Sequence, residues 1–596
     1  MTAVDYERLA PPSVPARRPW RWGALPLVGT AKPLHVGMAL FLYLFFGVFL
    51  LWPVVQIVRT GFVRQDGHVT LDYVRLIFSD PLLVRGLLNA ATVAVSVTLL
   101  TLVISLPLAV LGVRHEFPGR KLLSGLLLVP LVLPPFVGAI GMRMLLGRFG
   151  PLTQLLGGGP AGIDWMGKYR LAGIIVVEAL GLYPIMLLNL QAALANIDPA
   201  MEQAAANLGA GRWTVFRKIT LPLVRPGLFA GCTLVLIWSF TELGTPMMFD
   251  YFTITPVQVF KQITDVSSNP LPYALVVVML AASALLYLVG KVALGKPFDA
   301  ATSKASVAFV PRRLRGGKAL LATTAFAGVF FLAVLPHLSV IVTSLTTTQG
   351  WYKSILPAHW TLGHYRAALV DDLALPSVWN SICYAGGATV LAVIVGLCAA
   401  IVIVRSDVPG KGIIDSLCML PLAVPGLVLS FGYLSMSIWI KHKWGDRTPR
   451  FLDVQEWPVL VLILAYAARR LPYVVRATVA GLQQTPRDLE LAAANLGAPR
   501  HVVLGRITMP LIAANLIAGA LLAFAFAMLE VSDSLILAQR TTYYPITKAI
   551  LDLSQRLGDG LYIASALGVW AMVLLTLTIL SANALLGKKM GAVFRV

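Results

Sequence analysis

The heptapeptide AAANLGA occurs twice in this chain, at Ala204–Ala210 and again 288 residues later at Ala492–Ala498. The dipeptide Val113-Arg114 also returns, as Val404-Arg405, with an offset of 291 residues. An apolar composition repeats Leu and Ala by chance, but it does not repeat Asn, Gly, Pro and Arg in register. The chain therefore consists of two homologous halves. Further matches at an offset of 291 are Asn89 and Asn380, Pro130 and Pro421, and Pro134 and Pro425.

The composition is typical of a membrane protein. The 596 residues are 58% hydrophobic and only 13% charged, with a mean hydropathy of +0.79, whereas about a quarter of a soluble globular chain is charged. Apolar runs of about 20 residues match the length that an α-helix needs to cross a hydrocarbon core of roughly 30 Å. We find no alternating segments of about ten residues, which a membrane β-barrel would require. These features predict an all-α, polytopic membrane protein.

We expect about twelve transmembrane helices, arranged as two parallel six-span repeats. Six spans return the chain to its starting side, so the repeats have the same orientation, and such a pair encloses a path at its interface. The first repeat is predicted to span near 36–58, 88–113, 121–146, 171–194, 227–249 and 272–294. The second is predicted to span near 319–345, 380–404, 412–440, 458–482, 513–538 and 561–586.

Charge predicts the orientation. Lys and Arg are concentrated in the connector between the halves and in the segments that carry AAANLGA, which the positive-inside rule places in the cytoplasm. The formal net charge of +21 therefore reflects contact with a lipid bilayer and not binding of nucleic acid. We expect no cleavable signal peptide and two cytoplasmic termini. The predicted order is tail 1–35, first repeat 36–294, basic linker 295–318, second repeat 319–586 and tail 587–596.

Each copy of AAANLGA lies in a segment with the features of a short surface helix. Pro199 and Pro486 stand near the predicted helix starts, where proline is tolerated, and Glu202 and Glu490 complement the positive end of the helix dipole. The glycine of each heptapeptide fits a helix end with positive φ. The sequence then continues to ITLP or ITMP before the next span.

This pattern resembles the EAA loop of permeases in bacterial ATP-binding-cassette importers, which reads EAA, a gap, G and then I-x-L-P. Gln203 and Leu491 depart from it where a second acid is often found, and Met509 replaces the usual Leu. In that family the loop docks on an ATPase subunit, so the resemblance implies two ATPase copies as partners. The implied coupling residues are Glu202, Ala204, Ala205, Leu208, Gly209, Pro222, Glu490, Ala492, Ala493, Leu496, Gly497 and Pro510.

The chain has no nucleotide-binding motif of its own. No Gly-Lys pair is followed by the Ser or Thr that a phosphate-binding loop requires. Four cysteines form no CxxC pair, so neither a metal site nor a cofactor is expected. The resemblance implies a non-catalytic permease of the bacterial inner membrane with the fold of a type I importer, and a periplasmic substrate-binding protein as a further partner.

Charged groups inside the predicted spans are candidates for the translocation path, because each costs at least about 2.5–3.5 kcal/mol at the membrane centre. Glu242 and Glu530 are equivalent in the two repeats, and Asp533 aligns with Thr245. Prolines are expected to break the third and ninth spans. The path candidates are Glu242, Thr245, Glu530, Asp533, Pro134, Pro425 and Arg143.

Each of these polar residues also has a structural interpretation, which the sequence leaves open. The carboxylates can bond to a neighbouring helix, and Arg143, Arg469 or Arg470 can pair with a glutamate to hold helices together. Asn89 and Asn380 are predicted to cap the starts of their spans.

The fused halves and the run FTELGTP at Phe240–Pro246 resemble the ferric-iron transport group of these permeases. The substrate implied first is ferric iron. A small anion, such as a phosphonate or a sugar phosphate, is the alternative that the intramembrane arginines favour. An ion-coupled secondary transporter would account for the twelve spans, but not for the two docking loops. An intramembrane enzyme is disfavoured, because no nucleophile–base pair or HExxH motif occurs.

Overall fold

The computed structural model describes residues 33–63, 67–131, 134–155, 167, 169–263, 269–294, 311–348, 350–351 and 354–586. Most of the predicted N-terminal tail, the C-terminal tail and linker residues 295–310 lie outside these residues. Within the described part, nine helices are long and apolar enough to cross a membrane, or up to eleven if each of two bent helix pairs is one span. The prediction of an all-α, polytopic membrane protein is confirmed, with a number of spans close to twelve.

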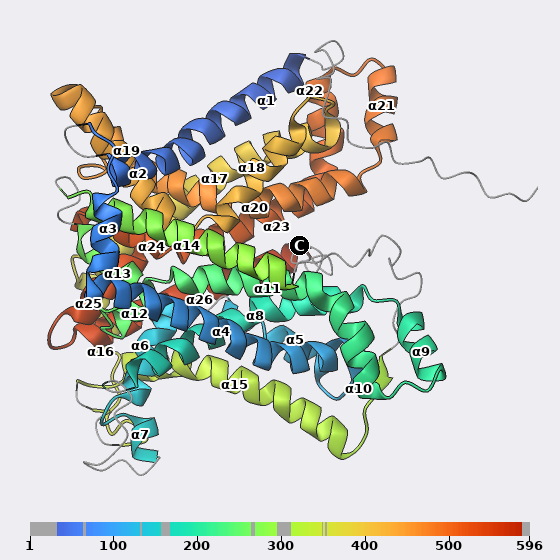
Figure 1. The fold of residues 1–596 in the computed structure, drawn as a ribbon, viewed down its shortest axis with the longest axis horizontal. Coiled ribbons are helices and arrows are strands. Elements are labelled where there is room, and N and C mark those ends of the chain that lie inside the picture. The colour runs from blue at the N-terminus through green and yellow to red at the C-terminus, as the bar shows by residue number, and fades with distance from the viewer. Residues whose placement is uncertain are drawn as a thin grey trace, which may run out of the picture.

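The helices follow the same order in both halves (Figure 1). The first half contains α1 (Pro33–Phe46), η3 (Gly47–Leu51), α2 (Trp52–Phe62), α3 (Asp72–Ser79), α4 (Pro81–Arg114), α5 (Arg120–Leu126), η4 (Val129–Leu131), α6 (Pro135–Leu146), α7 (Pro151–Leu155), α8 (Arg170–Ala195), α9 (Pro199–Asn207), α10 (Arg212–Val215), η5 (Phe216–Thr220), α11 (Leu221–Phe240), α12 (Gly244–Met248), α13 (Thr255–Lys261) and α14 (Leu271–Leu294).

The second half contains α15 (Gly317–Leu345), α16 (Gly363–Val370), α17 (Ala374–Arg405), α18 (Lys411–Ala423), α19 (Gly426–Trp444), η8 (Gly445–Arg447), η9 (Arg450–Leu452), α20 (Val459–Gln484), α21 (Arg487–Asn495), α22 (Arg500–Val503), η10 (Leu504–Thr508), α23 (Met509–Met528), α24 (Ser532–Leu537), η11 (Thr541–Tyr543), α25 (Ile546–Gln555) and α26 (Gly560–Leu586). Two short strands, β1 (His115–Glu116) and β2 (Arg312–Arg313), pair in parallel, and they attach the end of the linker to the first half.

The first span of each half packs against the opposite half (Figure 1). Helices α1 and α2 contact α17, α18 and α19, whereas α15 contacts α4, α5 and α6. Glycine permits both crossings, because a Cβ at Gly432 would lie 2.8 Å from Pro53, and a Cβ at Gly141 would lie 1.8 Å from the carbonyl oxygen of Pro336. Gly141 and Gly432 are repeat-equivalent. The two halves therefore interlock at matching positions.

Proline breaks the third and ninth spans, as predicted. The helices on the two sides of Pro134 are bent by 91°, and those near Pro425 are bent by 102°. Proline removes a backbone donor and clashes with the preceding turn. The freed backbone groups are tolerated at membrane depth where they face protein or a wet cavity.

The fifth and eleventh spans differ from the prediction of continuous helices over 227–249 and 513–538. Helix α11 ends at Phe240 and α12 follows after a short link, while α23 ends at Met528 and α24 follows likewise. Glu242 lies in the first link. Its Oε1 accepts hydrogen bonds from the amides of Gly244 and Thr245, at 3.1 and 3.2 Å. The side chain thus satisfies the amides that a new helix start leaves free.

The predicted caps at Asn89 and Asn380 are wrong. Helix α4 begins eight residues earlier, at Pro81, and its cap is Asp80, whose Oδ1 accepts from the amide of Leu82 at 2.7 Å. Asn89 instead donates to the carbonyl of Thr253 at 2.6 Å, and Asn380 donates to that of Thr542 at 2.9 Å. These asparagines tie α4 and α17 to the chain that follows α12 and α24, a long-range role that a local pattern does not encode.

Candidate functional site

A cavity of about 170 Å³ lies between the two halves, where the breaks in their helices meet. Five of the seven path candidates line it, namely Pro134, Glu242, Thr245, Pro425 and Glu530. Both halves contribute, as expected for a path along the axis that relates parallel repeats. Other residues of the lining include Pro135, Phe136, Glu178, Gly181, Leu182, Trp238, Gly426, Arg469, Arg470, Tyr473, Phe526 and Val531.

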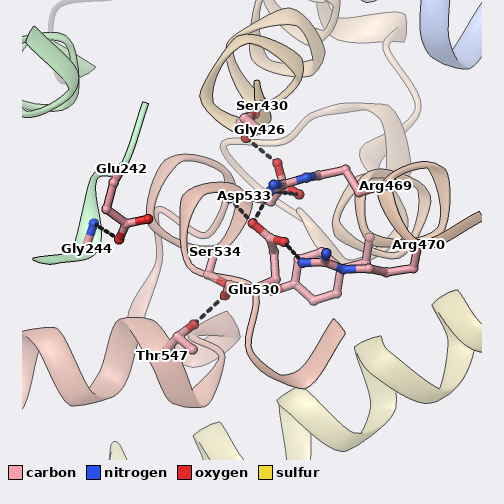
Figure 2. A network of polar contacts seen from close by, with 11 residues as sticks. Glu242, Gly244, Gly426, Ser430, Arg469, Arg470, Glu530, Asp533, Ser534 and Thr547 are labelled. Atoms are coloured by element: carbon pink, nitrogen blue, oxygen red, sulfur yellow. Dashed lines mark hydrogen bonds and ion pairs between the residues drawn. The ribbon is translucent and has the colours of Figure 1, made fainter. Parts of the chain in front are cut away.

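The second half contributes a buried cluster of charges (Figure 2). Glu530 forms ion pairs with both Arg469 and Arg470, and Arg469 also lies 3.6 Å from Asp533. The hydroxyl of Ser430 in turn donates to Asp533. The predicted Arg–Glu pairing between helices is therefore confirmed for α20 and the link before α24. Asp533 lies in this cluster and does not line the cavity.

The first half lacks the two arginines. Gly181 and Leu182 stand at the equivalent positions, 288 residues before Arg469 and Arg470. Among the described residues Glu242 forms no ion pair, and Figure 2 shows it apart from the arginine cluster. Glu178 is likewise without an arginine partner in this part of the chain, and its Oε2 accepts a hydrogen bond from Ser239 at 2.5 Å. The two sides of the cavity therefore differ in their acidic and basic side chains, although their helices follow the same order.

Arg143 does not line the cavity. Its guanidinium forms an ion pair with Asp250 at 2.8 Å and donates to the carbonyl of Met248 at 3.2 Å. Arg170 binds the carbonyl of Asp250 at 2.8 Å. Asp250 has a φ of +51°, which is unfavourable for a residue with a side chain, so the two arginines hold the chain after α12 in an uncommon conformation.

The two AAANLGA segments form short exposed helices, α9 and α21, on the same side of the helical bundle (Figure 1). Neither helix contains a buried residue. Gly209 and Gly497, with φ of +83° and +84°, end them as predicted. The leucines just before these glycines, Leu208 and Leu496, are each 89% exposed. Each helix thus presents an apolar side chain that the chain itself leaves uncovered.

The glutamate of each exposed helix is held by a threonine just before the next span. Thr220 donates to Glu202 at 2.6 Å, and Thr508 donates to Glu490 at 3.1 Å. An arginine at the end of α4 or α17 also binds each glutamate. Sequence analysis missed these threonine and arginine partners, although the repeated Val-Arg dipeptide marks both arginines.

The chain is thus a duplicated helical membrane protein, with interlocked bundles around a central cavity and one exposed helix from each bundle on a common face. A family model described as "Binding-protein-dependent transport system inner membrane component" matches the chain twice, over residues 101–296 and 392–591. The chain belongs to this family, and it is a multi-pass importer permease of the inner membrane. Membership favours an importer over the ion-coupled secondary transporter.

Several curated permeases are similar to the chain. It is 27% identical to the putative ferric transport system permease protein FbpB 1 of Haemophilus influenzae, over 85% of this chain and 78% of that protein. It is 28% identical to the ferric transport system permease protein FbpB of Actinobacillus pleuropneumoniae, over 93% of this chain and 78% of that protein. The molybdenum transport system permease protein ModB of Escherichia coli is 36% identical over 27% of this chain and 71% of its own length.

Among solved structures, the chain is similar to part of a bacterial ABC transporter involved in the import of the acidic polysaccharide alginate. The match has 17% identity and a TM-score of 0.37, and it covers 45% of this chain and 96% of that chain.

Proposed function

We propose that this permease forms the translocation path of an ATP-driven importer and docks two copies of a separate ATPase through α9 and α21. The observation that supports docking is the pair of exposed helices, each ended by a glycine with positive φ and each presenting an uncovered leucine. A duplicated surface on one face suits a partner that is itself present in two copies. The proposed coupling residues are those of the two EAA-like segments.

The proposed mechanism is alternating access. Closure of the ATPase dimer draws α9 and α21 together, and the two interlocked halves rock about the cavity between them. The bends near Pro134 and Pro425, together with the links that contain Glu242 and Glu530, place helix ends at the cavity rather than uninterrupted helices. Helix ends and loops are where hinge motions are usually absorbed.

The proposed substrate is ferric iron, delivered by a periplasmic binding protein. Two relatives named as ferric permeases match most of the chain. The acids Glu178, Glu242 and Glu530 outnumber the arginines in the lining of the cavity, and both arginines are already paired with Glu530. The cavity is also smaller than the roughly 300–1,000 Å³ of sites for drug-sized ligands, so in this conformation it suits a small ion.

Reconstitution tests this assignment. The permease, its ATPase and the iron-loaded binding protein are placed in proteoliposomes, and ATP hydrolysis and uptake of radioactive iron are measured. We expect iron-loaded binding protein to stimulate both, relative to the unloaded protein. If the iron-loaded protein stimulated neither ATP hydrolysis nor uptake, ferric iron would be excluded as the substrate. Docking is tested separately, by measuring ATPase binding to variants with substitutions in α9 and α21.

A small anion is the second candidate. Arg469 and Arg470 line the cavity, and part of the chain is similar to molybdenum transport permeases. A phosphonate, a sugar phosphate or molybdate offered with its binding protein in the same proteoliposomes is the direct comparison. Uptake of an anion without uptake of iron would establish this alternative.

The repeat boundaries and the orientation are also part of the proposal. We place the face with α9 and α21 in the cytoplasm, together with both termini and the linker at 295–318. Labelling of a cysteine at position 208, in a chain whose native cysteines are replaced, tests this. An impermeant maleimide should label L208C in inverted membrane vesicles but not in intact spheroplasts.

A further inference from the structure

The first-half side of the cavity contains oxygen atoms that have no hydrogen-bond partner among the described residues. Glu178 is 2% exposed, and its Oε1 is buried with no hydrogen bond among the described residues. The hydroxyl of Thr245 also has no hydrogen bond among the described residues, and Thr245 is fully buried. Both residues line the cavity. A buried polar atom without a partner is unfavourable, so such an atom needs an explanation.

The neighbouring carboxylate of Glu242 is positioned beside these atoms. Ser239 links the two acids, because its hydroxyl donates to Oε2 of Glu178 at 2.5 Å and its carbonyl accepts from the amide of Glu242 at 3.3 Å. The amides of Gly244 and Thr245 bind Oε1 of Glu242. Each carboxylate is therefore oriented through one oxygen by the protein, which leaves its other oxygen for a ligand.

The second half cannot offer the same oxygens. Its equivalent acid, Glu530, is neutralised by Arg469 and Arg470. Tyr466 replaces Glu178 at an offset of 288, and its hydroxyl is hydrogen-bonded to Ser534 at 2.5 Å. Among the described residues, the cavity-lining acids without an arginine partner are thus confined to one side.

We propose that Glu178, Glu242 and Thr245 form a transient binding site for a hard cation in the translocation path. Carboxylate and hydroxyl oxygens are the ligands that hard cations prefer, and a bound cation would offset the cost of burying the two carboxyl groups in their ionised form. Among the described residues no group of three or more His, Cys, Asp or Glu side chains could hold a metal ion. With two carboxyl groups and one hydroxyl as its protein ligands, the proposed site would bind a cation weakly, which transport requires because the ion must leave again. This inference rests on the proposed function for the identity of the cargo.

Terbium luminescence tests the site without transport. Tb³⁺ is a hard trivalent cation whose emission a nearby indole sensitises, and Trp238 lines the cavity. The purified, detergent-solubilised permease should give saturable sensitised emission. E178Q/E242Q should weaken Tb³⁺ binding at least tenfold, and T245V, which keeps the side-chain shape, should weaken it several-fold. W238F should reduce the emission without changing the affinity.

The matched control is E116Q/E456Q, which removes two carboxylates that are 58% and 48% exposed and should leave Tb³⁺ binding unchanged. Wild-type affinity in both E178Q/E242Q and T245V would overturn the site. In proteoliposomes, E178Q/E242Q should lose at least 90% of iron uptake, whereas E116Q/E456Q should take up iron as the wild type does. Tb³⁺ binding at this site without iron uptake by the wild type would retain the site and reject iron as cargo.

Discussion

Arg114, the last residue of α4, forms a bidentate ion pair with Glu202 of the exposed helix α9. The Nη1 atom of the arginine lies 2.6 Å from Oε2 of the glutamate, and Nη2 binds Oε1. The side chains are only 19% and 13% exposed. Arg405 and Glu490 repeat the contact in the second half at 3.2 Å. Each exposed helix is thus joined to a long membrane helix as well as to its own neighbours in sequence.

The first prediction concerns this connection. R114A, combined with R405A, should reduce the number of substrate molecules transported per ATP hydrolysed, because α9 and α21 can then move without α4 and α17. Hydrogen bonds to charged groups contribute about 1.5–3 kcal/mol each, so we expect transport to fall at least tenfold. ATP hydrolysis and uptake in proteoliposomes give the ratio. R120A is the control, since Arg120 only approaches the exposed Glu116 at 3.9 Å. Unchanged coupling in the double variant would contradict a mechanical role.

The second prediction concerns the C-terminal ends of α9 and α21. At Gly209 and Gly497 an added Cβ would meet nothing within 4 Å, so the effect of G209A/G497A arises from the positive φ alone. That backbone conformation costs a residue with a side chain roughly 1–2 kcal/mol. We expect about tenfold weaker binding of the ATPase, measured by titration of the purified permease.

Gly211 provides a matched control for this prediction. It lies two residues beyond Gly209 and is equally open, but its φ is −64°. G211A should therefore bind the ATPase as the wild type does. Equal effects of G209A and G211A would show that the backbone conformation at Gly209 is unimportant.

The third prediction separates the two repeat-equivalent acids. E530Q leaves Arg470 buried without its anion and leaves Arg469 with Asp533 alone, at 3.6 Å, and loss of one partner of a buried pair typically costs about 3–5 kcal/mol. E242Q removes no ion pair, so its effect on stability should stay within about 1 kcal/mol. Thermal denaturation in detergent should therefore show a much lower midpoint for E530Q than for E242Q. The opposite order would refute the assignment of Glu530 to a structural cluster.

The fourth prediction concerns Leu208 and Leu496. Truncation to alanine in L208A/L496A should leave the thermal midpoint unchanged, because both side chains are 89% exposed and exposed substitutions usually change stability by less than about 0.5 kcal/mol. Burial of a leucine in a partner's surface contributes about 1.5–3 kcal/mol. ATPase binding should therefore weaken at least tenfold. Normal binding with normal stability would show that the ATPase docks elsewhere.

Much of the architecture follows from the sequence. Pro134 and Pro425 predict the breaks in two spans, because proline acts on the turn in which it stands. Gly209 and Gly497 predict helix ends for a similarly local reason. The links at Glu242 and Glu530 were not predicted, since a helix of apolar residues continues unless a nearby side chain offers its amides another acceptor.

Local chemistry and the internal repeat determined the helical class, the duplication and the positions of the two exposed helices, because each depends on residues close together in the chain. Only the tertiary structure decided that Arg469 and Arg470 neutralise Glu530, whereas Glu178 and Glu242 at the same cavity have no basic partner among the described residues. These pairings join residues about 60 positions apart. They depend on how helices rotate and cross, which in turn depends on close contacts such as Gly141 against Pro336. Two halves with the same pattern can therefore enclose a cavity with chemically different sides.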